Sequence, residues 1–272
     1  DYGDMGTQSI VEIAKLYVEL IVNKKSVKHD FVLLGGYSSG CTLAYEMAIQ
    51  LERRGIATAV FLLDGIAPLV MQSLSDKKHA QYLLDSGLIS RIAEQVGIKG
   101  FLLPKGLLQE LSKKTKTEQI KYLFDLLRNE LREKQSSKAP SFSSSSSSSS
   151  SAKTEETDNE RIERILNTAE SFAIAILSYT PHDWVEQTVL IKASASLAQH
   201  LPSTYSQDKT LGWLLPESDI HVLAECNHFS LLSSNHLKNK LHKLLTQQEA
   251  RLHLRLSGRI FIEQYKSEEN TK

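Results

Sequence analysis

Residues 31–48 read FVLLGGYSSGCTLAYEMA, an apolar run followed by a glycine-rich turn. The first four residues, Phe31–Leu34, are all apolar, which is typical of a strand covered on both faces of a parallel sheet. From Cys41 to Arg54, apolar side chains recur at helical spacing. The segment therefore predicts a buried strand, a tight turn and a helix, in that order.

The turn contains Gly36-Tyr37-Ser38-Ser39-Gly40, a G-x-S-x-G pattern. Between a strand and a helix, this pattern exposes the central Ser38 hydroxyl at the carboxyl end of the sheet, as a nucleophile requires. The backbone N–H of Ser39 would then point toward a developing oxyanion. We expect the flanking Gly36 and Gly40 because a Cβ would clash where the chain reverses. An ordinary glycine-rich turn is the alternative interpretation.

A serine nucleophile needs a general base, and in folds with this turn the chain order is nucleophile, acid, base. His228 fits that order, because it follows a strand candidate, Ile220–Ala224, and precedes a final helix predicted at Ser234–Gln248. His221 lies inside the strand and is expected to point into sheet packing. We predict that His228 is the base; a polar loop residue is the alternative.

Asp64 is the predicted acid. It ends a second buried strand, Ala57–Leu63, which follows the predicted helix. At that strand end its carboxylate would lie beside the histidine and fix the imidazole tautomer. The strand candidate before the histidine-bearing one, Thr188–Lys192, is followed by no carboxylate until Asp208. A common Asp-Gly turn is the alternative to a catalytic role.

The order of these elements predicts an α/β fold with one open, mostly parallel sheet. Its core comprises residues 1–71 and 181–250. Residues 72–180 are dominated by helical patterns and are predicted to form a helical lid insertion. Within them Ser143–Ser151 is an unbroken serine tract, which buries nothing apolar and is expected to be disordered. The mixed and charged residues 251–272 form a C-terminal tail without assigned structure.

The composition excludes several function classes. Lysine and arginine total 32, as do aspartate and glutamate, so no net charge favours nucleic acid or an anionic membrane as a partner. No apolar run reaches the roughly 18 residues that cross a bilayer. The two cysteines, Cys41 and Cys226, indicate neither a disulfide framework nor a zinc site. This favours location in a reducing compartment such as the cytoplasm, and it favours a site without metal.

Three segments resemble the thioesterase domains that terminate fatty acid, polyketide and nonribosomal peptide synthases. Gly36–Ala48 is similar to the nucleophile segment of that family, Phe61–Gly65 to its acid-bearing strand, and Glu225–Leu232 to its histidine loop. The Gly-Tyr-Ser opening, the Phe-Leu-Leu-Asp-Gly form and Ser178–Pro181 resemble animal-type fatty acid synthases most. The resemblance covers most of the chain and implies an α/β-hydrolase fold.

The resemblance implies that Ser38, His228 and Asp64 release a long-chain fatty acid from the phosphopantetheine arm of an acyl carrier protein. The implied partners are the acyl carrier protein domain and the rest of the synthase polypeptide, and no cofactor of its own is required. The apolar stripes of the helical insertion would line the acyl chain, although helix packing also explains them. Two alternatives stay open: a stand-alone or polyketide- or nonribosomal-type release thioesterase, and a truncated, non-catalytic acyl-binding module.

The chain departs from the family pattern in two places. Ser39 stands where the family usually has a large side chain, which is expected to change a wall of the substrate groove. The chain also begins at Asp1 without methionine, and nothing before Ile10 resembles the upstream strand and loop that give the family a second oxyanion N–H. We therefore expect this chain to be a piece of a longer polypeptide. The N-terminal strands of the fold are expected to be missing from the piece.

Overall fold

The computed structural model describes four stretches of the chain: residues 8–24, 31–136, 157–216 and 219–269. The described residues form two compact units. The helical unit comprises Leu74–Leu177, and the sheet unit comprises Gln8–Ser73 together with the described residues from Ser178 onward. The predicted disordered tract, Ser143–Ser151, lies outside the described residues.

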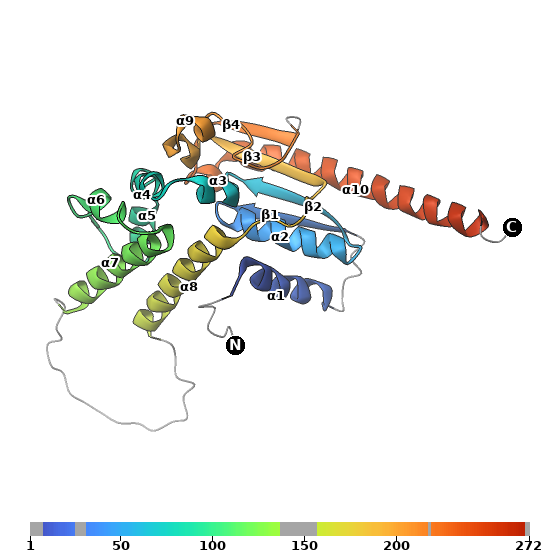
Figure 1. The fold of residues 1–272 in the computed structure, drawn as a ribbon. Coiled ribbons are helices and arrows are strands. Elements are labelled where there is room, and N and C mark those ends of the chain that lie inside the picture. The colour runs from blue at the N-terminus through green and yellow to red at the C-terminus, as the bar shows by residue number, and fades with distance from the viewer. Residues whose placement is uncertain (1–7, 25–30, 137–156, 217–218, 270–272) are drawn as a thin grey trace, which may run out of the picture. The chain divides into compact units, whose positions relative to one another are not determined.

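The sheet unit contains, within the described residues, four strands that all pair in parallel (Figure 1). The strands pair in chain order: β1 (Phe31–Tyr37), β2 (Ala57–Leu63), β3 (Gln187–Ala195) and β4 (Ile220–Asn227). The predicted α/β class with a mostly parallel sheet is confirmed. β1 and β4 both run further than predicted, and each of them ends directly before a candidate site residue.

One face of the sheet is covered by α1 (Ile10–Val22) and α2 (Gly40–Arg53). Val32 of β1 is buried in one cluster with Val18 from α1 and Leu51 from α2. Burial of such apolar side chains contributes roughly 1.5–3 kcal/mol each. The helix that follows the serine turn is thereby held against the strand that precedes the turn.

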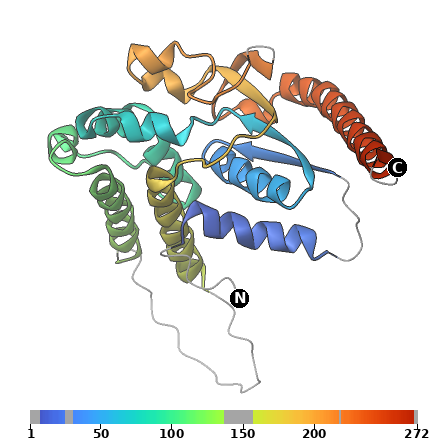
Figure 2. The same ribbon diagram turned by 45° about the vertical axis from the view of Figure 1, so that its right-hand side comes forward.

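The other face of the sheet is covered by α10 (Asn235–Glu269), which Figures 1 and 2 show on the opposite side of the strands from α2. Ala57 and Ala59 of β2 point to this face and are buried with Leu252 of α10. This contact explains why the last helix extends past its predicted end and through most of the predicted tail, residues 251–272. The charged composition of that segment conceals the buried apolar contact of Leu252 with β2.

α1 begins at a capping box formed by Ser9 and Glu12. The N–H of Glu12 donates to Ser9 Oγ at 3.3 Å, and the N–H of Ser9 donates to the Glu12 carboxylate at 2.8 Å. Two N–H groups at the start of the helix are satisfied in this way. The bond from the Ser9 backbone also lowers the pKa of the Glu12 carboxyl.

Buried hydrogen bonds fix the segment before β3 to α2. The hydroxyl of Tyr179 donates to the carboxylate of Glu46 at 2.6 Å, and both residues are buried. The N–H of Val185 donates to the hydroxyl oxygen of Tyr45 at 3.1 Å. Burial raises the pKa of Tyr179, so its hydroxyl keeps the proton that it donates. These contacts set the path of the chain into β3.

Shorter helices complete the sheet unit, and five helices of the helical unit are described. Those of the sheet unit are α3 (Pro68–Ser73), η1 (Leu197–His200), α9 (Ser203–Ser206) and η3 (Leu231–Ser233). Those of the helical unit are α4 (Asp76–Asp85), α5 (Leu88–Gln95), α6 (Leu107–Leu111), α7 (Lys116–Ser136) and α8 (Asp158–Ser178). The helical character predicted for residues 72–180 is observed in the described residues of this range, and the role of the region as a lid stays a prediction.

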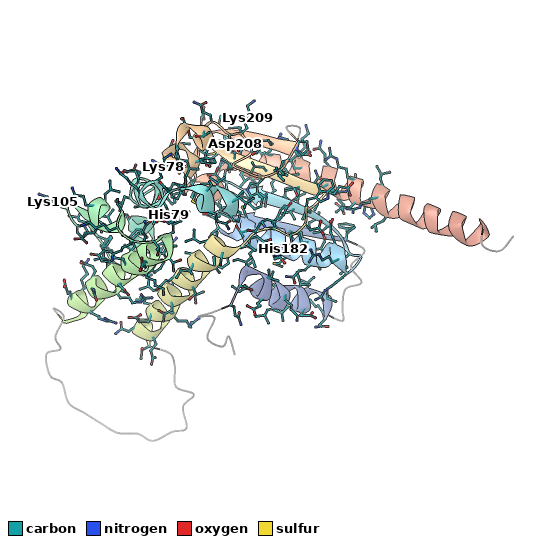
Figure 3. The ribbon with its side chains drawn as sticks, viewed as in Figure 1. Lys78, His79, Lys105, His182, Asp208 and Lys209 are labelled. Carbon is teal, nitrogen blue, oxygen red and sulfur yellow. The ribbon has the colours of Figure 1, made fainter. Side chains whose placement is uncertain are left out.

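A buried histidine lies inside the helical unit. His79 of α4, labelled in Figure 3, is 2% exposed, and its Nδ1 lies 2.8 Å from Oε1 of Gln119, which is 0% exposed. The amide nitrogen of Gln119 faces the carbonyl oxygens of Asp76, Leu111 and Lys114. The Gln119 oxygen is therefore the acceptor, and Nδ1 of His79 carries the hydrogen. Burial lowers the pKa of His79 because an imidazolium would lose its hydration.

We expect the helical unit to lose stability as the pH falls below about 6.5, the ordinary pKa of histidine. The unfolded chain binds the proton first, so stability present above that pH is lost as the pH falls toward the lower folded pKa. Hydrogen exchange of the α4 and α7 amides at about pH 7.5 and about pH 5 measures the loss. His79→Asn keeps a donor near Nδ1 without titrating and should remove most of the pH dependence; an equal loss of protection in both proteins would contradict this account.

Candidate active site

Ser38, Asp64 and His228 lie together at the carboxyl edge of the sheet. Each is the first residue after a strand: Ser38 after β1, Asp64 after β2 and His228 after β4. Nε2 of His228 lies 3.0 Å from Ser38 Oγ, and Nδ1 lies 2.9 Å from Asp64 Oδ2. The structure thus brings together the three residues that the sequence analysis selects as nucleophile, acid and base.

Ser38 occupies a strained turn between β1 and α2. Its φ is 55°, in the left-handed region that non-glycine residues rarely adopt. The N–H of Ser38 donates to the carbonyl oxygen of Leu63 at 2.9 Å, which ties the turn to the end of β2. The next residue, Ser39, is the N-cap of α2. Its N–H belongs to the first turn of the helix, where backbone donors have no partner within the helix.

The two glycines of the turn pattern have different surroundings. A Cβ added at Gly36 would lie 2.4 Å from the carbonyl oxygen of Gly40 and 2.6 Å from Cα of Cys41, so no side chain fits there. A Cβ added at Gly40 would meet nothing within 4 Å. The predicted clash at Gly40 is therefore wrong: residue 40 is the first residue of α2, and the space beside it is open.

Asp64 is held rigidly at the end of β2. It is 1% exposed and has a φ of 52°. Its N–H donates to the carbonyl oxygen of Ile191 at 2.8 Å, and its Oδ1 accepts from the N–H of Ala193 at 3.0 Å. The second carboxylate oxygen, Oδ2, faces His228. Both oxygens of this buried carboxylate therefore have a donor, one from β3 and one from the imidazole.

Asp208, the next carboxylate after the β3 segment, is engaged in its own loop (labelled in Figure 3). Its Oδ1 accepts from the N–H of Thr210 at 2.8 Å, and its Oδ2 accepts from the N–H of Gly212 at 3.0 Å. These bonds stabilise the turn after α9. The structure gives the histidine contact to Asp64 and not to Asp208.

A bulge in β4 directs His228 to the site. Leu223 of β4 pairs with Ala193 of β3, and the next pair is Asn227 with Ala195. β4 therefore advances four residues where β3 advances two. Glu225 lies in the bulge with a φ of 59°. Such a bulge bends a strand and turns its end away from the regular ladder. The N–H of His228 then donates to the carbonyl oxygen of Ala195 at 3.2 Å, which anchors the residue beside β3.

The hydrogen bonds define the imidazole tautomer. As a carboxylate, Asp64 can only accept, so Nδ1 of neutral His228 carries the hydrogen. Nε2 is then the acceptor of the Ser38 hydroxyl. This arrangement can move a proton from Ser38 to His228 and place the resulting imidazolium beside the Asp64 carboxylate.

Tyr37, which the sequence analysis includes only as part of the turn pattern, contacts His228 directly. The two rings are stacked with centroids 4.9 Å apart at 22°. The Tyr37 hydroxyl donates to the carbonyl oxygen of His228 at 2.7 Å. Phe229 packs edge-on against the imidazole, with centroids 5.3 Å apart at 86°. No sequence pattern signals these contacts, because they depend on the path of the chain after the β4 bulge.

The Thioesterase domain family matches residues 3–245 of the sequence. The chain belongs to this family. Membership of the thioesterase domain family implies a hydrolase that acts on thioesters. No curated protein matches the chain.

Two of the solved structures that resemble this thioesterase-family chain are a nonribosomal peptide synthetase and a thioesterase. One is AB3403 in its holo form, a four-domain nonribosomal peptide synthetase bound to AMP and glycine: it is 18% identical, with a TM-score of 0.49. The match covers 89% of this chain and 16% of the synthetase, so this chain spans a small part of that protein's length. The other is the RedJ thioesterase of the prodiginine pathway in Streptomyces coelicolor, 16% identical with a TM-score of 0.41, over 88% of this chain and 68% of that one.

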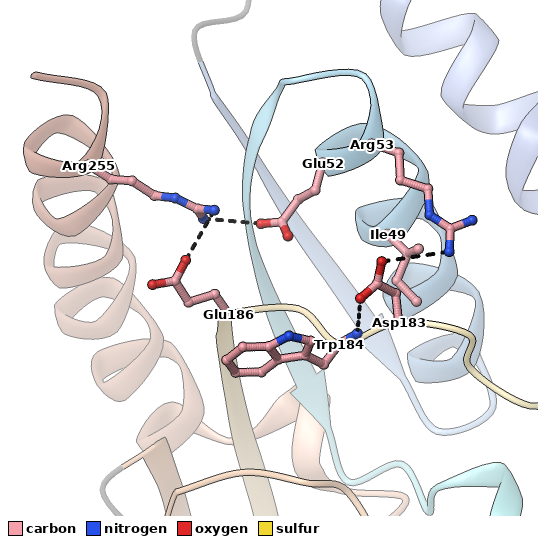
Figure 4. A pocket seen from close by; sticks show the side chains of 7 residues that line it. All are labelled: Ile49, Glu52, Arg53, Asp183, Trp184, Glu186 and Arg255. Carbon is pink, nitrogen blue, oxygen red and sulfur yellow. Dashed lines mark hydrogen bonds and ion pairs between the residues drawn. The ribbon is translucent and has the colours of Figure 1, made fainter. Parts of the chain in front are cut away.

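A pocket of about 260 Å³ lies in the sheet unit of the thioesterase-family domain (Figure 4). It lies at the carboxyl end of α2, and α2 begins beside Ser38 and is about 20 Å long. Arg255 pairs with Glu52 and Glu186. Arg53 pairs with Asp183. The pocket is lined by Ile49, Glu52, Arg53, Asp183, Trp184, Glu186 and Arg255. Its charged groups are thus paired with one another, and it contains none of the candidate catalytic residues.

In the described part of the chain, no group of three or more histidine, cysteine, aspartate or glutamate residues is arranged to hold a metal ion. Among the described helices, none is both long and apolar enough to cross a membrane. Cys41 and Cys226 are buried and form no disulfide. Burial raises the pKa of the Cys41 thiol, which disfavours the nucleophilic thiolate close to Ser38.

Gly36→Ala should disrupt the turn, whereas Gly40→Ala should be tolerated. The added Cβ at residue 36 meets backbone atoms that cannot move independently, and we expect a loss of roughly 3 kcal/mol or more in unfolding free energy. The added Cβ at residue 40 enters open space at a helix start, where alanine is favourable. Urea unfolding of both variants measures the difference. Equal stabilities of the two variants would show that the turn is not packed as described.

Proposed function

We propose that this domain is a serine hydrolase that releases a long-chain fatty acid from acyl carrier protein by cleaving the acyl thioester. The observation that carries the proposal is the unbroken hydrogen-bond chain from Ser38 through His228 to Asp64, with contacts of 3.0 and 2.9 Å. In this proposal Ser38 is the nucleophile and His228 is the general base. Asp64 fixes the tautomer and stabilises the imidazolium.

The first step forms an acyl-enzyme. Ser38 Oγ attacks the thioester carbonyl carbon while Nε2 of His228 takes the hydroxyl proton. The N–H of Ser39, at the start of α2, donates to the oxyanion of the tetrahedral intermediate. Collapse of the intermediate breaks the carbon–sulfur bond. The proton on Nε2 then passes to the sulfur, and the phosphopantetheine arm leaves as a thiol.

The second step releases the acid. His228 takes a proton from a water molecule, whose oxygen attacks the ester carbonyl carbon of the acylated Ser38. Collapse breaks the bond to Oγ, and His228 returns its proton to Ser38. Neither step requires a bound cofactor in this proposal, because Ser38 supplies the nucleophile and the phosphopantetheine arm arrives with the substrate.

The fatty acyl assignment is supported by sequence resemblance within the family. The Gly-Tyr-Ser opening of the turn, the segment Phe61–Gly65 and the segment Ser178–Pro181 resemble animal-type fatty acid synthases. On this basis we infer that the domain is the C-terminal part of a cytoplasmic fatty acid synthase and acts on the acyl carrier protein of the same polypeptide. Release of a polyketide or nonribosomal peptide is the alternative, and it fits the family match equally well.

Ser38→Ala should abolish covalent labelling by a fluorophosphonate probe without changing the fold, because a small, partly exposed hydroxyl is lost. Mass spectrometry of the labelled chain identifies the modified residue. We expect label on Ser38 in the wild type and none in the variant. Label that persists on another serine, or a wild-type chain that takes no label, would overturn the assignment in favour of another nucleophile or of a non-catalytic module.

Asp64→Asn should lower kcat by a factor on the order of 10³–10⁴, because an amide can donate to Nδ1 and favours the wrong imidazole tautomer. Asp208→Asn is the matched control, since the Asp208 carboxylate accepts hydrogen bonds from Thr210 and Gly212 of its own loop. The control should keep wild-type kcat. A loss of turnover in Asp208→Asn and not in Asp64→Asn would show that Asp64 is not the catalytic acid.

A panel of synthetic thioesters separates the two candidate substrate classes. We expect kcat/KM to rise from short-chain acyl to palmitoyl thioesters, since each buried methylene group contributes about 0.8 kcal/mol to binding. Peptidyl thioesters of similar size should be hydrolysed at least tenfold more slowly. A preference for the peptidyl series would assign the domain to nonribosomal peptide release.

A further inference from the structure

We propose that Tyr37 is a positioning residue that holds the backbone and ring plane of His228 in place for proton transfer from Ser38. The inference rests on the proposed function of the Ser38–His228–Asp64 site. It adds a role for the residue before the nucleophile, whose side chain does not itself touch the reacting atoms in this account.

The need for such a residue follows from the strand order. β4, which carries His228 at its end, is separated from β1 by β2 and β3. At the usual spacing of about 4.8 Å between strands, the ends of β1 and β4 are about 14 Å apart. The segment after the bulge must therefore carry the imidazole back across two strand ends to reach Ser38. A segment with that path needs attachments along it to keep one conformation.

Three of the four strand ends hold a different group of His228. Its N–H is bonded to Ala195 of β3 at 3.2 Å, and its Nδ1 is bonded to Asp64, which follows β2, at 2.9 Å. Its carbonyl oxygen accepts from Tyr37, the last residue of β1, at 2.7 Å. The Tyr37 hydroxyl thus makes the attachment that joins the histidine backbone to the strand bearing the nucleophile.

The Tyr37 ring restrains the tilt of the His228 imidazole, which the hydrogen bonds alone do not fix. A single bond from Nδ1 to Asp64 fixes one ring atom and still allows the imidazole to tilt about that contact. The stacked Tyr37 ring, with centroids 4.9 Å apart and planes at 22°, opposes this tilt. A face-to-face aromatic neighbour also favours an imidazolium, because the negative face of the ring attracts the positive charge. Both effects act during proton transfer and not in substrate binding.

Tyr37 is itself fixed, so it can act as a reference for the histidine. It pairs with Leu63 in the parallel ladder and packs against the core cluster that contains Ile191 and Leu231. Because Ser38 is the next residue in the chain, one strand end sets the position of the nucleophile and also of its base. Movement of β1 would then shift Oγ and Nε2 together and preserve the distance between them.

The test compares two substitutions of Tyr37 with a matched tyrosine elsewhere. Tyr37→Phe removes the hydroxyl and keeps the ring, and Tyr37→Leu removes both. Tyr45→Phe is the control, because the Tyr45 hydroxyl also bonds a backbone group, the N–H of Val185, without contacting His228. Each variant of the whole chain is assayed for kcat and KM on a palmitoyl thioester, for melting temperature, and for the downfield proton resonance of the bond between Nδ1 of His228 and Asp64.

We expect kcat to fall about 10-fold in Tyr37→Phe and about 100-fold in Tyr37→Leu with KM unchanged, since misplacement by about 1 Å can cost this much. The downfield resonance should broaden in Tyr37→Phe and disappear in Tyr37→Leu. The melting temperature of Tyr45→Phe should fall by about as much as that of Tyr37→Phe. Its kcat and its downfield resonance should stay at the wild-type values.

Wild-type kcat and an unchanged resonance in both Tyr37 variants would overturn the proposal. So would equal losses of kcat in Tyr37→Phe and Tyr45→Phe, because the effect would then be one of general stability. The resonance is observed without turnover. If the wild-type chain hydrolyses no thioester, the proposed function fails, while the resonance still decides whether Tyr37 positions His228.

Discussion

Parallel pairing makes every strand of this sheet end at the same edge, and the candidate site depends on that constraint. Ser38, Asp64 and His228 are far apart in the sequence, but each directly follows a strand. β2 is buried along its whole length and pairs with both β1 and β3, so it fixes the register of these two strands relative to each other. A shift of β2 by one residue would move Asp64 by about 3.3 Å relative to Ser38. The imidazole could then not reach both groups.

The site uses backbone conformations that are unfavourable in isolation. Three of the described non-glycine residues with positive φ adjoin it: Ser38 at 55°, Asp64 at 52° and Glu225 at 59°. Each conformation of this kind costs on the order of 1–3 kcal/mol. The turn at Ser38 is held by the hydrogen bond from its N–H to Leu63. The turn at Asp64 is held by the corresponding bond to Ile191. The positive-φ conformations direct the site residues toward one another. Hydrogen bonds to the ends of neighbouring strands offset the free-energy cost of these conformations.

Sequence patterns predicted the features that depend on chain neighbours. β2 has its predicted bounds, Ala57–Leu63, because an apolar run ends abruptly there. The three site residues could be selected because each follows a recognisable strand, while their catalytic roles stay predictions. Other features depend on distant contacts and could not be predicted: the β4 bulge, the contact of Tyr37 with His228, and the extension of α10 through Leu252.

The left-handed backbone at Ser38 also limits which amino acid could serve as the proposed nucleophile. Cysteine has the same unbranched shape as serine and fits a φ of 55° equally well. Threonine carries a second heavy atom on Cβ, and β-branched residues are strongly disfavoured at positive φ. The geometry of the turn, and not the reactivity of the hydroxyl, therefore excludes the other aliphatic alcohol. For protein engineering, the position permits the exchange of oxygen for sulfur but not the addition of a methyl group.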